Sequence, residues 1–179
     1  TSLKNKYNAF FVLDDAHGIG VLGDGTGSSS LFNGKSEVDI CIGTLSKSIG
    51  SYGGFVCGKK NLIDFLINRC RTQIYTTGLP PSVLAASIKA IKIIINSPQL
   101  IKKPIENATY FSDIFGLKKP TSSIVPVILN HESRVISACK YLENRGILVG
   151  GIRPPTVPKN TSRLRIAFNS SHTKRNIED

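Results

Sequence analysis

The chain has 179 residues, 40% of them hydrophobic, and its 23 Lys and Arg against 12 Asp and Glu give a formal net charge of +11. This length and apolar content suit one domain or two small ones with a buried core, and they exclude a disordered tail or a disulfide-stapled miniprotein. Because the lysines fall in separated pairs and aromatic residues make up only 7%, the positive charge favours a solvated surface, or an anionic cofactor or thioester substrate, over nucleic acid.

Three apolar runs in the first third of the chain predict β-strands. Residues 9–13 and 38–42 are continuous apolar runs, which are typical of strands buried on both faces of a parallel sheet. The segment between them, residues 18–34, is rich in Gly, Ser and Asn and is expected to form a loop. Residues 53–57 predict a third strand, and the apolar positions within residues 62–67 predict a helix of about three turns.

A longer helix is predicted after the pair Pro80–Pro81, which suits a helix start. Four large aliphatic residues then recur at the spacing of one helix face, and they predict that this face is buried: Leu84, Ile88, Ile91 and Ile95. Pro98 is expected to end this helix, because proline cannot continue the hydrogen-bond ladder.

The remaining sequence predicts a small α+β domain. It begins with a joint rich in Lys and Pro (residues 102–104), which is followed by a short helix (106–115) and a strand (124–129). The next helix has Val135, Cys139 and Leu142 on one face and ends before Gly146. A final strand covers residues 164–168. We therefore predict an α/β chain with a domain boundary near residue 97.

Residues Gly18–Gly23 satisfy the GxGxxG pattern of dinucleotide-binding proteins and follow a predicted strand. In that motif the third glycine lies in a helix whose N-terminal amides hold pyrophosphate, and an acidic residue ends the next strand. Here the Gly/Ser-rich residues 24–30 do not suit a helix, and Glu37 comes before the second apolar run. The sequence context therefore argues against a nicotinamide or flavin site.

Lys47 lies in a segment of hydroxyls and glycines, residues 43–50, directly after a predicted buried strand. A desolvated lysine loses its charge readily, which is what an amine needs in order to form an imine with an aldehyde cofactor. The hydroxyls of Thr44, Ser46 and Ser48 are suited to bind a phosphate. Taken alone, however, the segment is equally compatible with an ordinary loop lysine.

Asp14 ends the first predicted strand, and His17 follows three residues later. Pyridoxal phosphate acts as an electron sink only while its ring nitrogen stays protonated, and a carboxylate beside that nitrogen keeps it so. His17 is suited to donate a hydrogen bond to the phenolic oxygen of the same ring. Singly, these residues are compatible with a loop cap and a strand-end histidine, but together with Lys47 they predict one site.

Four separated motifs then carry a resemblance to a known family: residues 13–18, 43–47, 75–81, and 152–158 with Arg163–Arg165. In this order, over nearly the whole chain, they resemble the α-oxoamine synthases, which are homodimeric fold type I pyridoxal-phosphate enzymes. The resemblance implies a transferase that condenses an amino acid with an acyl thioester and releases carbon dioxide. Residues 152–158 most resemble the branch that joins alanine to a pimeloyl thioester, presented by coenzyme A or a carrier protein, in biotin synthesis. The nearest competing branch joins glycine to an acyl-CoA.

The resemblance implies a cofactor role for each matching residue. Lys47 would be the Schiff-base lysine of pyridoxal 5'-phosphate, Asp14 would pair with the pyridine nitrogen and His17 with the phenolic oxygen. Thr44 would bind the cofactor phosphate. Thr76–Thr77 match a phosphate-binding pair that reaches the cofactor of the neighbouring subunit, and their alternative use is to cap the helix after Pro80.

For the substrate, the resemblance implies that Arg165 holds the carboxylate of the amino acid, a role that suits the planar guanidinium. Arg163 is expected on the same face of the final strand and is the structural alternative. Thr156 and Arg153 match positions near the substrate less closely.

The resemblance covers the C-terminal half of the family. It implies that residues 1–97 are the C-terminal part of the large cofactor-binding domain and that residues 98–179 are the small domain. The family's N-terminal half, which carries the aromatic side chain that stacks on the cofactor ring, has no counterpart in this sequence. Because this half is missing, we expect the chain to be inactive alone. The sequence also has no Met and opens with Thr1–Lys4, so we expect it to start inside a longer reading frame.

Two other classes stay open, a basic nucleic-acid-binding module and a noncatalytic remnant. The four cysteines are widely spaced and lack the spacing of metal ligands, so we expect reduced core thiols, no metal site and a cytoplasmic location. No apolar run reaches the roughly 18 to 20 residues of a membrane span, so we expect no membrane partner.

Overall fold

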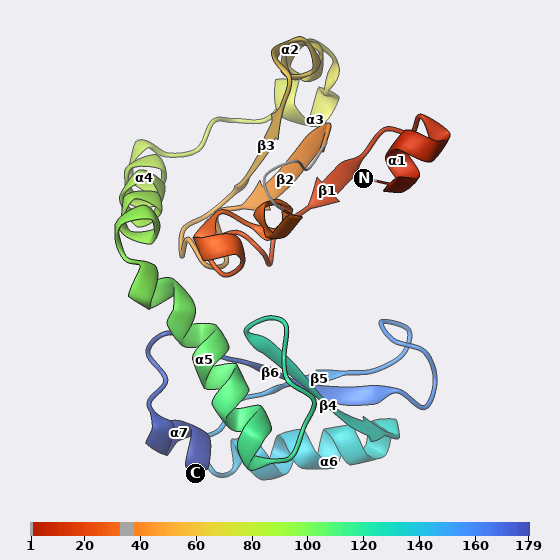
Figure 1. Ribbon diagram of the computed structural model, residues 1–179, viewed down its shortest axis with the longest axis vertical. Coiled ribbons are helices and arrows are strands. Elements are labelled where there is room, and N and C mark those ends of the chain that lie inside the picture. The colour runs from red at the N-terminus through yellow and green to blue at the C-terminus, as the bar shows by residue number, and fades with distance from the viewer. Residues whose placement is uncertain (1, 33–37) are drawn as a thin grey trace. The chain divides into compact units, whose positions relative to one another are not determined.

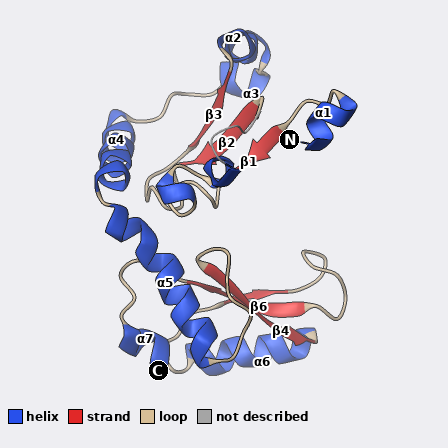
Figure 2. Cartoon of the chain, viewed as in Figure 1, coloured by secondary structure: helices blue, strands red, loops and turns tan. Residues whose placement is uncertain are grey.

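The computed structural model describes residues 2–32 and 38–179, so Glu37 lies outside the described residues. The chain divides into two compact units, Thr1–Lys102 and Lys103–Asp179, which are described separately (Figure 1). Each unit contains one three-stranded sheet together with helices, so the described chain is a mixed α/β protein with two small sheets (Figure 2).

The sheet of the first unit has the strand order β1-β2-β3 (β1 Val12–Asp14, β2 Ile40–Thr44, β3 Gly54–Gly58). Strand β1 pairs with β2 in parallel, as predicted, with Asp14 opposite Ile42. Strand β3, in contrast, runs antiparallel to β2. The connection formed by residues 45–53 is shorter than the dozen or so residues that a parallel crossover needs. The expectation of a mostly parallel sheet therefore does not extend to β3.

The helices of the first unit cover less of the sheet than the apolar patterns predicted. They are α1 Ser2–Tyr7, α2 Lys60–Arg69, α3 Arg71–Ile74 and α4 Pro81–Asn96, with 3-10 turns at Gly23–Gly25 and Ser28–Phe32. Phe10 and Val12 are exposed, whereas every residue of β2 is half-buried or buried. The prediction of burial on both faces is therefore wrong for the run 9–13.

Helix α4 begins at Pro81, as predicted, but its aliphatic stripe is not buried: Ile88 is 55% exposed and Ile95 is 71% exposed. The helix packs through other residues instead. The Ser87 hydroxyl is buried and donates to the Val83 carbonyl at 2.8 Å, and it lies 2.9 Å from the Ser51 hydroxyl. The periodicity of the sequence thus predicted an amphipathic helix correctly, but it carried no information on what covers the apolar face.

The second unit is an antiparallel sheet packed against helices. It contains β4 Ile124–Asn130, α6 Glu132–Glu143, β5 Gly150–Ile152, β6 Ser162–Ala167 and α7 Lys174–Glu178 in the strand order β4-β6-β5. Helix α6 lies against the sheet through Val135, which is almost fully buried. At Gly151 of β5, a Cβ atom would lie 2.9 Å from Val135 Cγ1, so glycine permits this close approach.

Helix α5, Pro98–Ile114, runs through the segment that was predicted to be a joint followed by a short helix. Pro104 lies inside it, although a proline in a helix removes one hydrogen bond and clashes with the carbonyl four residues earlier. Buried residues on both sides of the proline, Ile101 and Ala108, anchor the helix and offset this cost. No single helix of the described chain is long and apolar enough to cross a membrane, and α4 and α5 reach that length and composition only as a bent pair.

Candidate active site

The predicted cofactor residues gather at the carboxyl ends of the two parallel strands of the first unit. Asp14 is the last residue of β1, and Thr44 is the last residue of the adjacent β2. Lys47 follows Thr44 in the hairpin of residues 45–53 that leads into β3. In open α/β sheets, ligands bind outside the carboxyl ends of the strands, so this edge is the expected place for a site.

The hairpin that carries Lys47 is held by its own backbone. The Leu45 N–H donates to the Gly53 carbonyl at 2.9 Å, and the Ser51 N–H donates to the Leu45 carbonyl at 2.7 Å. Leu45 and Ile49 are buried and anchor the hairpin, whereas Lys47 between them is exposed. The expectation that Lys47 is desolvated is therefore wrong for the described chain, in which the residue is exposed.

The hydroxyls beside Lys47 differ in their bonding. Thr44 Oγ1 donates to the Gly53 carbonyl at 3.1 Å, and it accepts from the Ser46 N–H at 3.2 Å and lies 2.8 Å from Ser46 Oγ. Ser48 Oγ donates to the Ile19 carbonyl in the preceding glycine-rich loop. The Thr44 and Ser46 hydroxyls thus lie together beside Lys47, while Ser48 joins the hairpin to that loop.

The two adjacent aspartates after β1 have different environments. Asp14 is exposed, and its carboxylate accepts the Ala16 N–H at 3.0 Å. Asp15 is only 3% exposed, and its carboxylate accepts the Ser28 N–H at 2.8 Å and the Ser28 hydroxyl at 2.7 Å. Asp15, for which no sequence pattern predicted a role, thus closes the glycine-rich loop.

The glycines around Asp15 serve this closure. A Cβ atom at Gly18 would lie 1.9 Å from one carboxylate oxygen of Asp15, and a Cβ at Gly27 would lie 2.1 Å from the other. Residues 15–27 form turns and a 3-10 segment rather than an α-helix, which confirms the expectation that this glycine-rich segment is a loop. His17 lies in the first of these turns and is exposed.

Thr76–Thr77 lie in the link between α3 and α4 and are exposed. The N-cap residue of α4 is Pro80, and no side chain caps this helix. The alternative that these threonines cap the helix is therefore wrong. Neither hydroxyl has a hydrogen-bond partner among the residues that the structure describes, which leaves both available to a ligand.

The predicted substrate residues belong to the second unit and are described within that unit alone. Arg163 and Arg165 alternate with buried Leu164 on β6, so the two guanidiniums share the face that α6 leaves open. Arg163 Nε donates to the Thr161 carbonyl at 2.8 Å, whereas Arg165 is exposed and has no such bond in the described chain. On the segment after β5, the Thr156 N–H donates to the Arg153 carbonyl at 3.0 Å.

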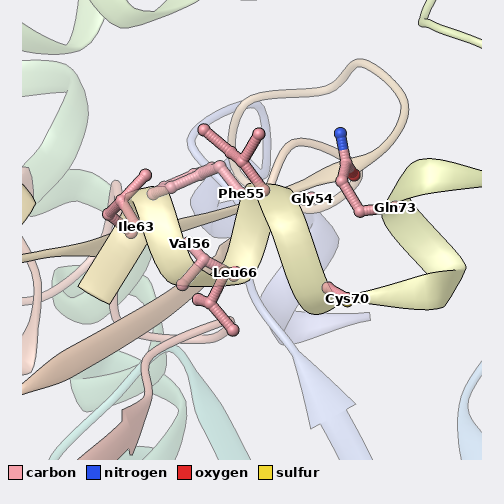
Figure 3. Close-up of a pocket in the computed structure, with 8 residues that line it drawn as sticks. Gly54, Phe55, Val56, Ile63, Leu66, Cys70 and Gln73 are labelled. Atoms are coloured by element: carbon pink, nitrogen blue, oxygen red, sulfur yellow. The ribbon is translucent and has the colours of Figure 1, made fainter. Parts of the chain in front are cut away.

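An apolar cavity of about 370 Å³ lies beside β3, and none of the predicted site residues lines it. Phe55 and Val56 of β3 and Leu66 of α2 form its walls, and Cys70 and Gln73 supply its polar atoms (Figure 3). The thiol of Cys70 is held by the Thr72 hydroxyl and the Gln73 N–H, and these bonds lower its pKa.

The residues of the first unit fit a cofactor that carries an aldehyde, a phosphate and a pyridine ring. Lys47 offers an exposed amine, Asp14 an exposed carboxylate and the Thr44–Ser46 pair two hydroxyls, all at one edge of the sheet. These are the donor types that bind an aldehyde, a ring nitrogen and a phosphate, respectively.

Comparisons with known proteins agree with this donor set. A family model described as aminotransferase class I and II matches residues 1–179. The 8-amino-7-oxononanoate synthase of Maricaulis maris is 43% identical over 177 residues, which are 99% of this chain and 45% of that protein. A structure of serine palmitoyltransferase from S. paucimobilis with a bound PLP–myriocin aldimine matches with a TM-score of 0.89 at 27% identity, covering 99% of this chain and 46% of that one.

The structure of the 8-amino-7-oxononanoate synthase of Francisella tularensis matches with a TM-score of 0.81 at 30% identity, covering 93% of this chain and 51% of that one. The chain therefore spans about half the length of the relatives that it matches.

Proposed function

The chain belongs to the class I and II aminotransferase family, and from this membership we propose that it is the cofactor-lysine and substrate-arginine part of an 8-amino-7-oxononanoate synthase. Such an enzyme joins alanine to a pimeloyl thioester, presented by coenzyme A or a carrier protein, with loss of carbon dioxide in biotin synthesis. The observation that carries this proposal is the 43% identity to the Maricaulis maris enzyme along 99% of the chain. The proposed domains are residues 1–97 of the large cofactor domain and the small domain 98–179.

Lys47 is proposed to bond the aldehyde of pyridoxal 5'-phosphate and afterwards to move the α-proton of the substrate. When bound, the cofactor supplies an electron sink for the charge that develops at the α-carbon. Asp14 is proposed to hold the proton on the ring nitrogen, and His17 to orient the ring through its phenolic oxygen. The exposed positions of all three side chains support access to a ligand at this edge of the sheet.

The phosphate of the cofactor is proposed to bind to Thr44 and, from the neighbouring subunit of a homodimer, to Thr76–Thr77. The Thr44 hydroxyl donates to the Gly53 carbonyl at 3.1 Å, and rotation about its Cβ–Oγ1 bond would turn this proton toward a phosphate oxygen. The absence of a capping role for Thr76–Thr77 in the described chain supports their use by a ligand.

The amino-acid carboxylate is proposed to bind Arg165, with Arg153 and Thr156 near the substrate. The structure favours Arg165 over Arg163 because the Arg163 guanidinium already donates to the Thr161 carbonyl. A bidentate contact with a carboxylate fixes the orientation of the α-carbon bonds as well as holding the substrate.

The test uses the protein at the length of its relatives, loaded with pyridoxal 5'-phosphate. Borohydride reduction followed by peptide mapping is expected to find the cofactor on Lys47, with Lys47→Ala unlabelled and the matched Lys59→Ala labelled normally. Label on another lysine contradicts the assignment. Salt-sensitive nucleic-acid binding that survives Lys47→Ala, with no cofactor bound, would favour the nucleic-acid module, and an intact protein that binds neither would be a remnant.

Substrate choice is tested on the same protein by product formation from pimeloyl thioester with alanine, and from acyl-CoA with glycine, which is the substrate pair of the competing branch. We expect Arg165→Ala to weaken alanine binding by about 1.5 to 3 kcal/mol, the scale of a charged hydrogen bond, and Arg163→Ala to weaken it far less. The reverse ranking of these two variants identifies Arg163 as the carboxylate residue.

A further inference from the structure

Two of the four cysteines, although 16 positions apart in the sequence, lie directly opposite each other in the sheet of the first unit. Cys41 of β2 and Cys57 of β3 are register partners in an antiparallel pair, and both are free thiols. Side chains of directly opposed residues point to the same face of a sheet. The expectation that the cysteines are core residues is wrong, because Cys57 is exposed and the other three are half-buried.

The hydrogen-bond pattern gives the spacing of this pair. The Leu45 N–H donates to the Gly53 carbonyl, and hydrogen-bonded pairs recur at every second position of an antiparallel ladder. The pair Cys41–Cys57 is therefore hydrogen-bonded, with a Cα separation of about 5.5 Å. This value lies at the usual separation for a disulfide, although the Cβ atoms must approach slightly, which makes the bond easier to reduce.

The two thiols differ in their access to solvent. Cys57 is open to solvent, so an oxidant reaches it first. Burial raises the pKa of Cys41, and the carboxylates of Asp15 and Asp14 together with Cys57 raise it further. Asp14 ends β1 and Asp15 directly follows it, and Cys57 lies opposite Cys41 on β3. Cys41 is therefore suited to react second, once its neighbour has been activated.

We propose that Cys41 and Cys57 form a reversible disulfide that responds to peroxide and closes the base of the hairpin carrying Lys47. The Cys57 thiolate attacks one peroxide oxygen, the O–O bond breaks, and the departing oxygen leaves as water after protonation. The Cys41 thiolate then attacks the resulting sulfenic sulfur and expels a second water. Two thiols and one hydrogen peroxide thus give one disulfide and two waters, and a dithiol reverses the change.

The bond would cross-link β2 to β3 on the sheet side of Thr44 and Lys47, which both lie between the two cysteines in the sequence. It closes a covalent loop that contains the whole hairpin. Amide hydrogen exchange within residues 41–57 is therefore expected to slow on oxidation and to recover on reduction. This inference rests on the strand register and does not depend on the proposed function.

The test treats the full chain with hydrogen peroxide and maps disulfide-linked peptides by mass spectrometry without reduction. We expect a loss of two hydrogens from the intact mass, a linked peptide that joins Cys41 to Cys57, and reversal by dithiothreitol. Cys41→Ser and Cys57→Ser should each lose the link, whereas the matched controls Cys70→Ser and Cys139→Ser should keep it. The mapping of the unsubstituted chain stands even where a variant fails to fold.

The pH dependence adds a second readout. Because the pKa of Cys41 is raised, its thiolate is scarce near neutral pH, and the rate of linkage should climb from about pH 7 to about pH 9. The proposal is overturned if the peroxide-treated chain keeps both thiols, carries them only as higher oxides, or links either of them to Cys70, Cys139 or a second chain.

Discussion

At the scale of single residues, the neighbouring carboxylates of Asp14 and Asp15 differ in role because their environments differ. Asp14 is at the solvent-facing end of β1 and makes one local bond to the Ala16 N–H. Asp15 is buried and satisfies both the amide and the hydroxyl of Ser28. A buried carboxylate with two such donors stabilises the fold, whereas an exposed one is available to a ligand.

This contrast predicts opposite outcomes for the two alanine variants. Asp15→Ala leaves the Ser28 N–H without its acceptor and should lower the free energy of unfolding by about 1.5 to 3 kcal/mol, the range for hydrogen bonds to a charged group. Asp14→Ala should change it by less than about 0.5 kcal/mol, as is usual for exposed sites. Urea unfolding measures both, and equal losses for the two variants would contradict this division of tasks.

The sequence identified Asp14 but not Asp15 for a physical reason. Asp14 could be placed because a strand end beside a second strand end is a recognisable position for a ligand, and Lys47 supplied the matching chemistry. The partner of Asp15 is Ser28, and a contact across an irregular glycine-rich loop leaves no periodic signal. The pairing of Cys41 with Cys57 was missed because it depends on the register of β3, which no pattern in the sequence fixes.

At the scale of elements, long periodic segments were predicted well and short or interrupted ones were not. The apolar runs located β1, β2, β3, β4 and β6, and the shared face of Val135 located α6. Strand β5 contains Gly150–Gly151, which lack β-propensity, and it pairs only because β6 offers a free edge. Helix α5 passes through Pro104 because packing on both sides of the proline outweighs its local penalty.

The short helix α7 shows how side chains fix an element that propensity alone does not predict. Thr173 and Asn176 form a reciprocal cap at its start, and the Tyr110 hydroxyl of α5 donates to the Glu178 carboxylate near its end. Buried Ile177 adds an apolar contact to the core. Five residues of helix are thereby held by contacts at both ends, although a free helix of that length is unstable.

The contact between Tyr110 and Glu178 predicts a dependence on alkaline pH. The carboxylate raises the pKa of Tyr110 above its ordinary value of 10.0. A group whose pKa is raised by folding stabilises the folded state below its ordinary pKa, and this stabilisation is lost as the pH rises through the raised value. As the pH is raised above about 10, the Tyr110→Phe variant should therefore lose less of its free energy of unfolding than the unsubstituted chain loses. Thermal unfolding at several pH values measures this difference, and parallel losses in the two proteins would argue against the contact.

At the scale of the whole molecule, the chain exposes apolar side chains that its sequence pattern predicted to be buried. The stripe on α4 and the exposed Phe10 and Val12 are the largest departures from the predicted burial. Sequence periodicity shows which faces are apolar, but the element that covers each face is set by tertiary structure. The relatives are about twice as long as this chain, which agrees with the proposal that a further part of the protein and a second subunit pack on these faces.

The proposed use of Thr76–Thr77 across a dimer can be tested by mixing two defective subunits at the length of the relatives. One subunit carries Lys47→Ala, and the other carries Thr76→Ala with Thr77→Ala, so each homodimer lacks one component at both sites. If the threonines serve the partner's cofactor, a mixed dimer places both defects in one site and leaves the other site intact. Random mixing makes half of the dimers mixed, so co-expression should restore about one quarter of the normal specific activity.

If the threonines instead serve the cofactor of their own subunit, each site of the mixed dimer keeps one defect and no activity returns. Co-expression of Lys47→Ala with Lys59→Ala controls for the dilution of subunits and should give about half of the normal activity, because every Lys59→Ala subunit brings one working lysine. If the control co-expression reaches about half of the normal activity and the mixed pair has none, Thr76–Thr77 belong to the site of their own subunit. Recovery in the mixed pair would require both the dimer and the exchange of these two residues across it, since neither alone reconstructs an intact site from two defective chains.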